Sequence, residues 1–124
     1  MAVEALAQFQ PETAVYLRDL YSLGILNIAW IGWLWKKLKE ERSEADGIPI
    51  EDLEVHHKKR RWEGGTDDEN NLTALKKTEH ALEHYKAAQK AKGKARRNEY
   101  GAVHLIVQRM SPEELAEFNK HLRD

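Results

Sequence analysis

The chain has 124 residues, the length of one compact domain, of which 41% are hydrophobic and 33% are charged. This composition supplies enough apolar side chains for a core and excludes a wholly disordered chain. Cysteine is absent, which excludes disulfides, thiolate zinc sites and cysteine nucleophiles.

The net charge of −1 conceals an uneven distribution along the chain. Residues 1–54 have a net charge of −5 and residues 98–124 one of −2, whereas residues 55–97 carry 12 Lys/Arg against 6 Asp/Glu, a net charge of +6. The same middle segment holds four of the six histidines. A basic segment rich in histidine indicates an anionic partner.

The N-terminal segment, residues 1–46, is predicted to be helical. Residues 11–22 favour a short helix because Pro11 suits a first helical turn. The 16 residues of Leu20–Trp35, which overlap the end of that helix, contain no charge but three tryptophans. A membrane span needs about 20 apolar residues, so a membrane is disfavoured, and we expect a buried helix or a contact that forms a homodimer or larger assembly. The helix should continue to Glu44 and stop at Gly47 and Pro49.

The middle segment, residues 47–95, is predicted to form a β-hairpin followed by a helix. Residues 53–57 and 71–75 are expected strands, and the loop of residues 62–68 between them contains a double glycine that permits a tight turn. Thr78 is expected to cap a helix that runs to about Lys92 and ends at Gly93. The predicted fold class is therefore mostly α with a small β-hairpin.

The C-terminal segment, residues 96–124, is predicted to contain two more helices, and all three segments are expected to form one domain. The first helix covers residues 96–110. The second begins at Ser111-Pro112, with Glu114 three residues after the serine, which is the pattern of a capping box. Leu115, Phe118 and Leu122 should give it an apolar stripe.

Four histidines in the middle segment have spacings that favour one metal site. His80 and His84 are four residues apart on a predicted helix, so they share a face and can hold one ion. His56 and His57 are adjacent on a predicted strand and should point to opposite sides. One of these two can complete the metal site while the other takes a proton from water, which is the division of labour that phosphodiester hydrolysis needs. Asn71 is available to orient the base.

These residues, in this order, resemble the HNH (His-Me finger) endonuclease family. The resemblance covers about residues 50–90 and rests on Leu53-Glu54-Val55-His56-His57, Gly64-Gly65-Thr66-Asp67-Asp68, Asn71-Leu72 and His80-Ala81-Leu82-Glu83-His84. It implies a ββα-metal core around one divalent ion, flanked here by N-terminal and C-terminal helices. It also implies that His57 is the general base, that Asn71 orients it and that His56, His80 and His84 are the metal ligands.

The family resemblance implies hydrolysis of nucleic acid, with DNA favoured over RNA. An all-nitrogen ligand set favours tight binding of zinc or nickel, while magnesium or manganese can still support turnover. The expected contacts to phosphate come from basic residues beside the hairpin and the helix, namely Lys58, Lys59, Arg60, Arg61, Lys76 and Lys77.

Two matters stay open at the level of sequence. An HNH-like fold can also serve as a non-catalytic binding or assembly module, for example as a phage structural component, and the tryptophan-rich run would fit that alternative. The compartment is also open, although a cytoplasmic location is consistent with the absence of cysteine and of a signal peptide.

Overall fold

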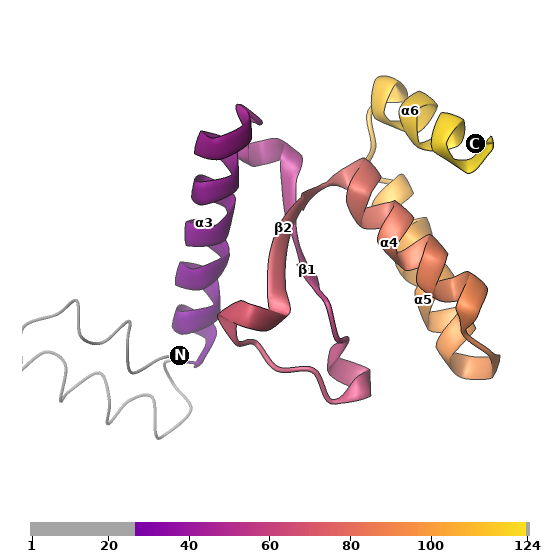
Figure 1. Cartoon of the computed structure of the whole chain (residues 1–124), viewed down its shortest axis with the longest axis horizontal. Helices are drawn as coiled ribbons and strands as arrows, with labels where there is room; N and C mark the ends of the chain where they lie inside the picture. Colours follow the sequence, from indigo (N-terminus) through magenta and orange to yellow (C-terminus); the bar gives the residue numbers. More distant parts are fainter. Residues whose placement is uncertain (1–26, 124) are drawn as a thin grey trace, which may run out of the picture. The chain divides into compact units, whose positions relative to one another are not determined.

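The computed structural model describes residues 27–123. The predicted helix over residues 11–22 and the first part of the uncharged run lie outside the described residues. Along the rest of the chain the elements are α3 (Asn27–Asp46), β1 (Leu53–His57), β2 (Leu72–Lys76), α4 (Lys77–Lys90), α5 (Gly93–Val107) and α6 (Pro112–Arg123). The prediction of a mostly helical fold with a small hairpin is confirmed, since β1 and β2 pair as a two-stranded antiparallel sheet (Figure 1).

The described chain divides into two compact units. Residues 27–47 and 57–74 belong to the first unit, and residues 48–56 and 75–123 belong to the second. The division falls inside both strands of the hairpin. His56 and His57 therefore belong to different units, although they are neighbours in sequence.

The first unit combines α3 with the long connection between the strands. Arg42 on α3 donates a hydrogen bond from Nη1 to the carbonyl oxygen of Ala74 (2.8 Å), and Lys37 lies 3.6 Å from the carboxylate of Glu69. Leu34 is fully buried, and Leu72 and Ala74 are buried as well. The helix thus contributes an apolar side chain to the core of this unit and secures the β2 end of the connection with polar contacts.

The end of α3 matches the sequence prediction. The helix continues past Glu44 to Asp46, and Gly47 follows in the left-handed region with a φ of 69°. The amide of Gly47 still donates to the carbonyl of Ser43, which completes the last helical turn. None of the helices within residues 27–123 combines the length and the apolarity that crossing a bilayer requires. The assembly contact through Leu20–Trp35 stays a prediction.

Two glycines shape the turn that follows β1. Gly64 has a φ of 88°, a conformation that strongly favours glycine, and this confirms the predicted turn. A Cβ on Gly65 would lie 1.8 Å from the carbonyl oxygen of Lys59, so no larger residue fits at this position. The segment is more ordered than a plain loop, because a 3-10 turn begins at Arg61.

The second unit is built from α4, α5 and α6, with α5 running alongside α4 (Figure 1). Its core contains Ala81 from α4, Ile106 from α5 and Phe118 from α6. The capping box at the start of α6 is confirmed, since Ser111 Oγ accepts from the amide of Glu114 while the Glu114 carboxylate accepts from the amide of Ser111. Of the predicted stripe on α6 only Phe118 is buried; Leu115 and Leu122 stay exposed.

The boundaries of α4 differ from those predicted. The helix begins at Lys77 rather than at a Thr78 cap, because the carboxylate of Glu79 accepts a hydrogen bond from the amide of Lys76. It ends at Lys90, where the Arg96 side chain donates to the carbonyl of Ala91 and so satisfies the end of the helix. The prediction that Gly93 ends this helix was therefore wrong. Gly93 instead begins α5, with a φ of 60°.

Candidate metal centre

Three imidazole rings from two elements of the second unit form one cluster. His56 comes from β1, and His80 and His84 lie one turn apart on α4. The three ring centroids are 4.9 to 5.1 Å from one another, and one nitrogen from each ring lies within 4.8 Å of the others. His56 and His84 are buried, whereas His80 is partly exposed. This group could hold one metal ion.

His80 and His84 each form a hydrogen bond with a glutamate through Nδ1. Glu54 Oε1 lies 3.0 Å from His80 Nδ1, and Glu99 Oε2 lies 2.5 Å from His84 Nδ1. Glu99 comes from α5 and is only 3% exposed. Metal-binding histidines in proteins characteristically present their second ring nitrogen to a carboxylate in this way, because the contact fixes both the tautomer and the ring orientation.

These contacts decide which ring nitrogen faces the cluster. Glu54 is ionised and can only accept, so His80 Nδ1 carries the proton of that hydrogen bond, and an ionised Glu99 would place a proton on His84 Nδ1 in the same way. Each neutral ring then presents a bare lone pair at Nε2. The two Nε2 atoms of His80 and His84 lie 3.2 Å apart. Two lone pairs at this separation repel each other unless a proton or a cation lies between them.

The donor set therefore fits a transition-metal ion. Zinc binds histidine nitrogen at about 2.0–2.1 Å in a tetrahedral arrangement, which places two ligand nitrogens about 3.3 Å apart. The 3.2 Å separation of the His80 and His84 Nε2 atoms is close to that value. His56 completes the group, because one nitrogen of its ring lies within 4.8 Å of those of His80 and His84. The prediction that these three histidines lie together is confirmed; the identity of the ion stays a prediction.

A strong ion pair supports the glutamate behind His80. Arg109, which follows α5, donates from Nε to Glu54 Oε2 (2.8 Å) and from Nη2 to Glu54 Oε1 (2.9 Å). Burial raises the pKa of Glu54, but the hydrogen bonds from His80 and Arg109 outweigh it and lower this pKa from its ordinary 4.5 to about 2. Glu54 raises the pKa of Arg109 in turn. Glu54 is therefore ionised at any physiological pH and can act only as an acceptor.

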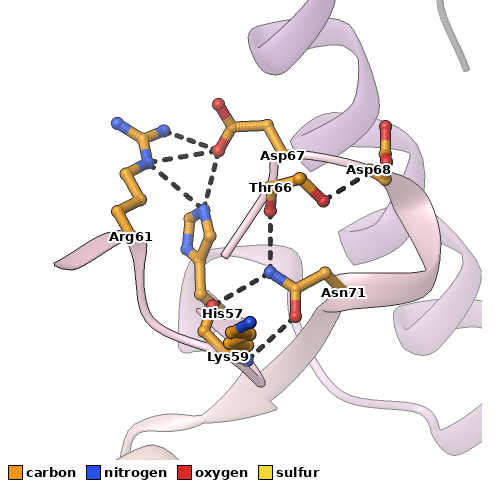
Figure 2. Close-up of polar contacts among 7 residues, drawn as sticks. All are labelled: His57, Lys59, Arg61, Thr66, Asp67, Asp68 and Asn71. Carbon is orange, nitrogen blue, oxygen red and sulfur yellow. Dashed lines mark hydrogen bonds and ion pairs between the residues drawn. The ribbon is translucent and has the colours of Figure 1, made fainter. Parts of the chain in front are cut away.

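His57 has a separate set of partners in the first unit. Its Nε2 lies 2.8 Å from Asp67 Oδ1, and Arg61 donates to the same oxygen from Nε (3.1 Å) and Nη2 (2.9 Å), as Figure 2 shows. Burial raises the pKa of Asp67, but the hydrogen bonds from His57 and Arg61 prevail and lower it. The adjacent histidines thus have different partners, as the alternation of side chains along a strand predicts.

Asn71 contacts backbone groups on both sides of the connection. Its Nδ2 donates to the carbonyls of Lys59 (3.0 Å) and Thr66 (2.7 Å), and its Oδ1 accepts from the amide of Lys59 (2.9 Å), as Figure 2 shows. Its own carbonyl also accepts from the amide of Lys58 (2.8 Å). These bonds clamp the segment that follows His57 against the segment that carries Asp67. The role predicted for Asn71, orienting the base, stays a prediction.

The predicted phosphate-binding residues fall into two groups. Four of them make ion pairs or more than one hydrogen bond within the protein. Arg60 donates to the carbonyls of His57 and Lys58, Arg61 binds Asp67, and Lys76 and Lys77 pair with the carboxylates of Glu117 and Glu114. The other two, Lys58 and Lys59, are exposed. Lys58 makes one long contact to the carbonyl of Asn70 (3.3 Å). These two lysines are the predicted cations best placed to meet an external anion.

Three residues of the site were not predicted individually from the sequence. Glu54 and Glu99 hold metal-site histidines, and Asp67 holds His57. Glu54 could have been predicted, because a strand residue two positions before His56 lies on the same face of the strand.

Comparison of the chain with protein-family models, with curated proteins and with solved structures found no match.

Proposed function

We propose that this chain is a metal-dependent endonuclease that hydrolyses the phosphodiester bonds of DNA. The observation that carries the proposal is the cluster of His56, His80 and His84, with both helical ligands held by carboxylates. Structural zinc sites in proteins almost always have four protein ligands, whereas catalytic sites typically have three and leave one position for a reacting group. The cluster within the described residues has three members.

In this proposal the residues have separate roles in one displacement at phosphorus. The bound divalent ion would stabilise the negative charge that builds up on the phosphate and the leaving oxygen. His57 takes the proton from a water molecule, and the water oxygen forms a new bond to phosphorus. The bond from phosphorus to the 3′-oxygen breaks and this oxygen takes a proton from solvent water, which leaves a 5′-phosphate and a 3′-hydroxyl. Lys58 and Lys59 supply contacts to phosphate that do not depend on base sequence.

The test is cleavage of supercoiled plasmid, linear duplex, single-stranded DNA and RNA by the purified chain. The chain is loaded with zinc, nickel, magnesium or manganese in turn. We expect DNA cleavage that a chelator abolishes. His84→Ala should remove both metal binding and cleavage, whereas His104→Ala, which alters an exposed histidine on α5, should leave both unchanged. The double variant Lys58→Ala/Lys59→Ala should weaken DNA binding and flatten its salt dependence.

Two results would overturn the proposal in different ways. A chain that binds metal through the three histidines but cleaves no nucleic acid with any ion would be a non-catalytic metal-binding module. A chain that binds no transition metal with at least micromolar affinity would lose the metal site itself.

A further inference from the structure

Within the described residues, the carboxylate of Asp67 makes a close polar contact with the His57 ring. It receives His57 Nε2 at 2.8 Å, and the side chains of both residues are mostly shielded from solvent, with 16% of His57 and 25% of Asp67 exposed. Arg61 donates twice to the same oxygen (Figure 2). An aspartate that accepts two hydrogen bonds from a guanidinium is ionised near neutral pH, and an ionised carboxylate can only accept hydrogen bonds.

The proton on His57 is therefore located by elimination. Because Asp67 cannot donate, the hydrogen bond requires a proton on His57 Nε2. Arg61 Nε also lies 3.4 Å from His57 Nε2 in the orientation of a donor, but this contact is longer than the 3.1 Å hydrogen bond from Arg61 Nε to Asp67 Oδ1 and than the 2.8 Å contact between His57 Nε2 and Asp67 Oδ1. A neutral imidazole carries one proton, so Nδ1 holds the lone pair. Nδ1 is then the nitrogen of His57 that can accept a proton from water.

Backbone contacts around Asp67 hold its carboxylate in position to contact the His57 ring. Asn71 clamps Thr66, the residue before Asp67, and Lys59, two residues after His57, as Figure 2 shows. Gly65 lies so close to Lys59 that no side chain fits between them. The aspartate is consequently held at the ring by a constrained turn, whereas a surface aspartate on a free loop would sample many positions.

We propose that Asp67 is a positioning residue that fixes His57 in the Nε2–H tautomer and so makes Nδ1 the proton-accepting atom. This inference rests on the proposed function of His57 as the general base. Asp67 acts through His57 and does not touch substrate. After proton transfer His57 carries a positive charge, and the ionised Asp67 stabilises that charge through the same hydrogen bond. Arg61 keeps Asp67 ionised and correctly placed.

The first test reads the tautomer directly, without any measurement of activity. Long-range proton–nitrogen correlation spectra of the zinc-loaded, ¹⁵N-labelled protein distinguish a protonated ring nitrogen from a bare one, and His57→Gln identifies the signals of this ring. We expect the Nε2–H form near neutral pH. In Asp67→Asn the amide can donate to Nε2, so the Nδ1–H form should gain population. Asp67→Glu should largely keep the wild-type form, and Asp68→Asn, whose side chain contacts Thr66, is the matched control.

The second test measures cleavage. Asp67→Asn should lower kcat by about 100-fold or more, the lower range for the contribution of general acid–base catalysis, with little change in KM. Asp67→Glu should rescue part of the loss, and Asp68→Asn should have near wild-type kcat. A residue that only supported the fold would lower stability without changing the tautomer.

The outcomes separate this inference from the proposed function. A wild-type His57 in the Nδ1–H form overturns the inference whatever the activity, and this single measurement decides even where Asp67→Asn fails to fold. An Asp67→Asn protein that is folded, with both an unchanged tautomer and an unchanged kcat, also overturns it. The expected tautomer in a protein that cleaves no nucleic acid leaves Asp67 as the residue that holds the ring and overturns the nuclease proposal instead.

Discussion

Replacing Glu99 by glutamine should weaken metal binding although Glu99 is not itself a ligand. Glu99 Oε2 lies 2.5 Å from His84 Nδ1 and fixes the proton there, which leaves Nε2 bare for the ion. A glutamine can turn its amide nitrogen toward Nδ1 instead. Its N–H then requires a lone pair on Nδ1, which moves the ring proton to Nε2 and removes a ligand atom.

The expected size of the effect follows from the burial of the pair. Loss of a partner of this kind typically lowers metal affinity by about 10- to 100-fold, which is about 1.4 to 2.7 kcal/mol. Glu99 is only 3% exposed, so water cannot easily take the place of its oxygen. We therefore expect a loss near the upper end of this range for both zinc and nickel.

The assay is competition for the ion between the protein and a coloured chelator of known affinity. Glu83→Gln is the matched control, because Glu83 is an exposed glutamate on the same helix as the ligands His80 and His84. Circular dichroism of each metal-free variant establishes that the helices are intact. Equal dissociation constants for a folded Glu99→Gln and for Glu83→Gln would refute the reasoning that the carboxylate sets the tautomer.

Two further predictions concern stability. The pKa of Glu54 in the folded protein, about 2, is below its unfolded value, so the resulting stabilisation is complete above about pH 5 and is lost as the pH falls from about 4.5 toward 2. Urea unfolding in the presence of chelator should therefore show wild type more stable than Glu54→Gln at pH 7, by at most about 3 kcal/mol, and the gap should shrink to about a quarter of its size by pH 2.5; a gap independent of pH would contradict the assigned cause. Gly65→Ala should destabilise the turn that carries Asp67, because the added Cβ would lie 1.8 Å from the Lys59 carbonyl oxygen. Gly101→Ala in α5, where the same atom meets nothing within 4 Å, should instead stabilise by about 0.5–1 kcal/mol, and equal effects of the two changes in thermal unfolding would count against the described turn.

The cluster of three histidines could be predicted from the sequence because local geometry determines most of its arrangement. An interval of four residues places His80 and His84 on one face of any helix. The strand pattern around His56 and the turn residues before Asn71 then bring the hairpin back toward the start of that helix. Ordinary short-range rules were sufficient for this part of the site.

The supporting carboxylates depend on packing that no short window of sequence contains. Glu99 lies 15 residues after His84, in a stretch rich in lysine and arginine that resembles a solvated helix face. Only the packing of α5 against α4 turns this one side chain inward. The end of α4 was mispredicted for a related reason, since the Arg96 side chain, from the next helix, satisfies its last carbonyls.

Asp67 was missed because two neighbouring aspartates look alike in the sequence. The turn between the strands selects Asp67 for His57 and leaves Asp68 with Thr66. That choice follows from the Asn71 clamp and from the close approach at Gly65, both of which join residues on opposite sides of the turn.

His84 and Glu99 form an interacting polar pair in the interior of the second unit. Exchanging interacting buried polar groups for hydrocarbon side chains of similar volume is often neutral or raises protein stability by about 1 to 4 kcal/mol. Packing of α4 against α5 does not by itself require a polar pair at this point, and such pairs are found in proteins where selection acts on chemistry as well as on folding.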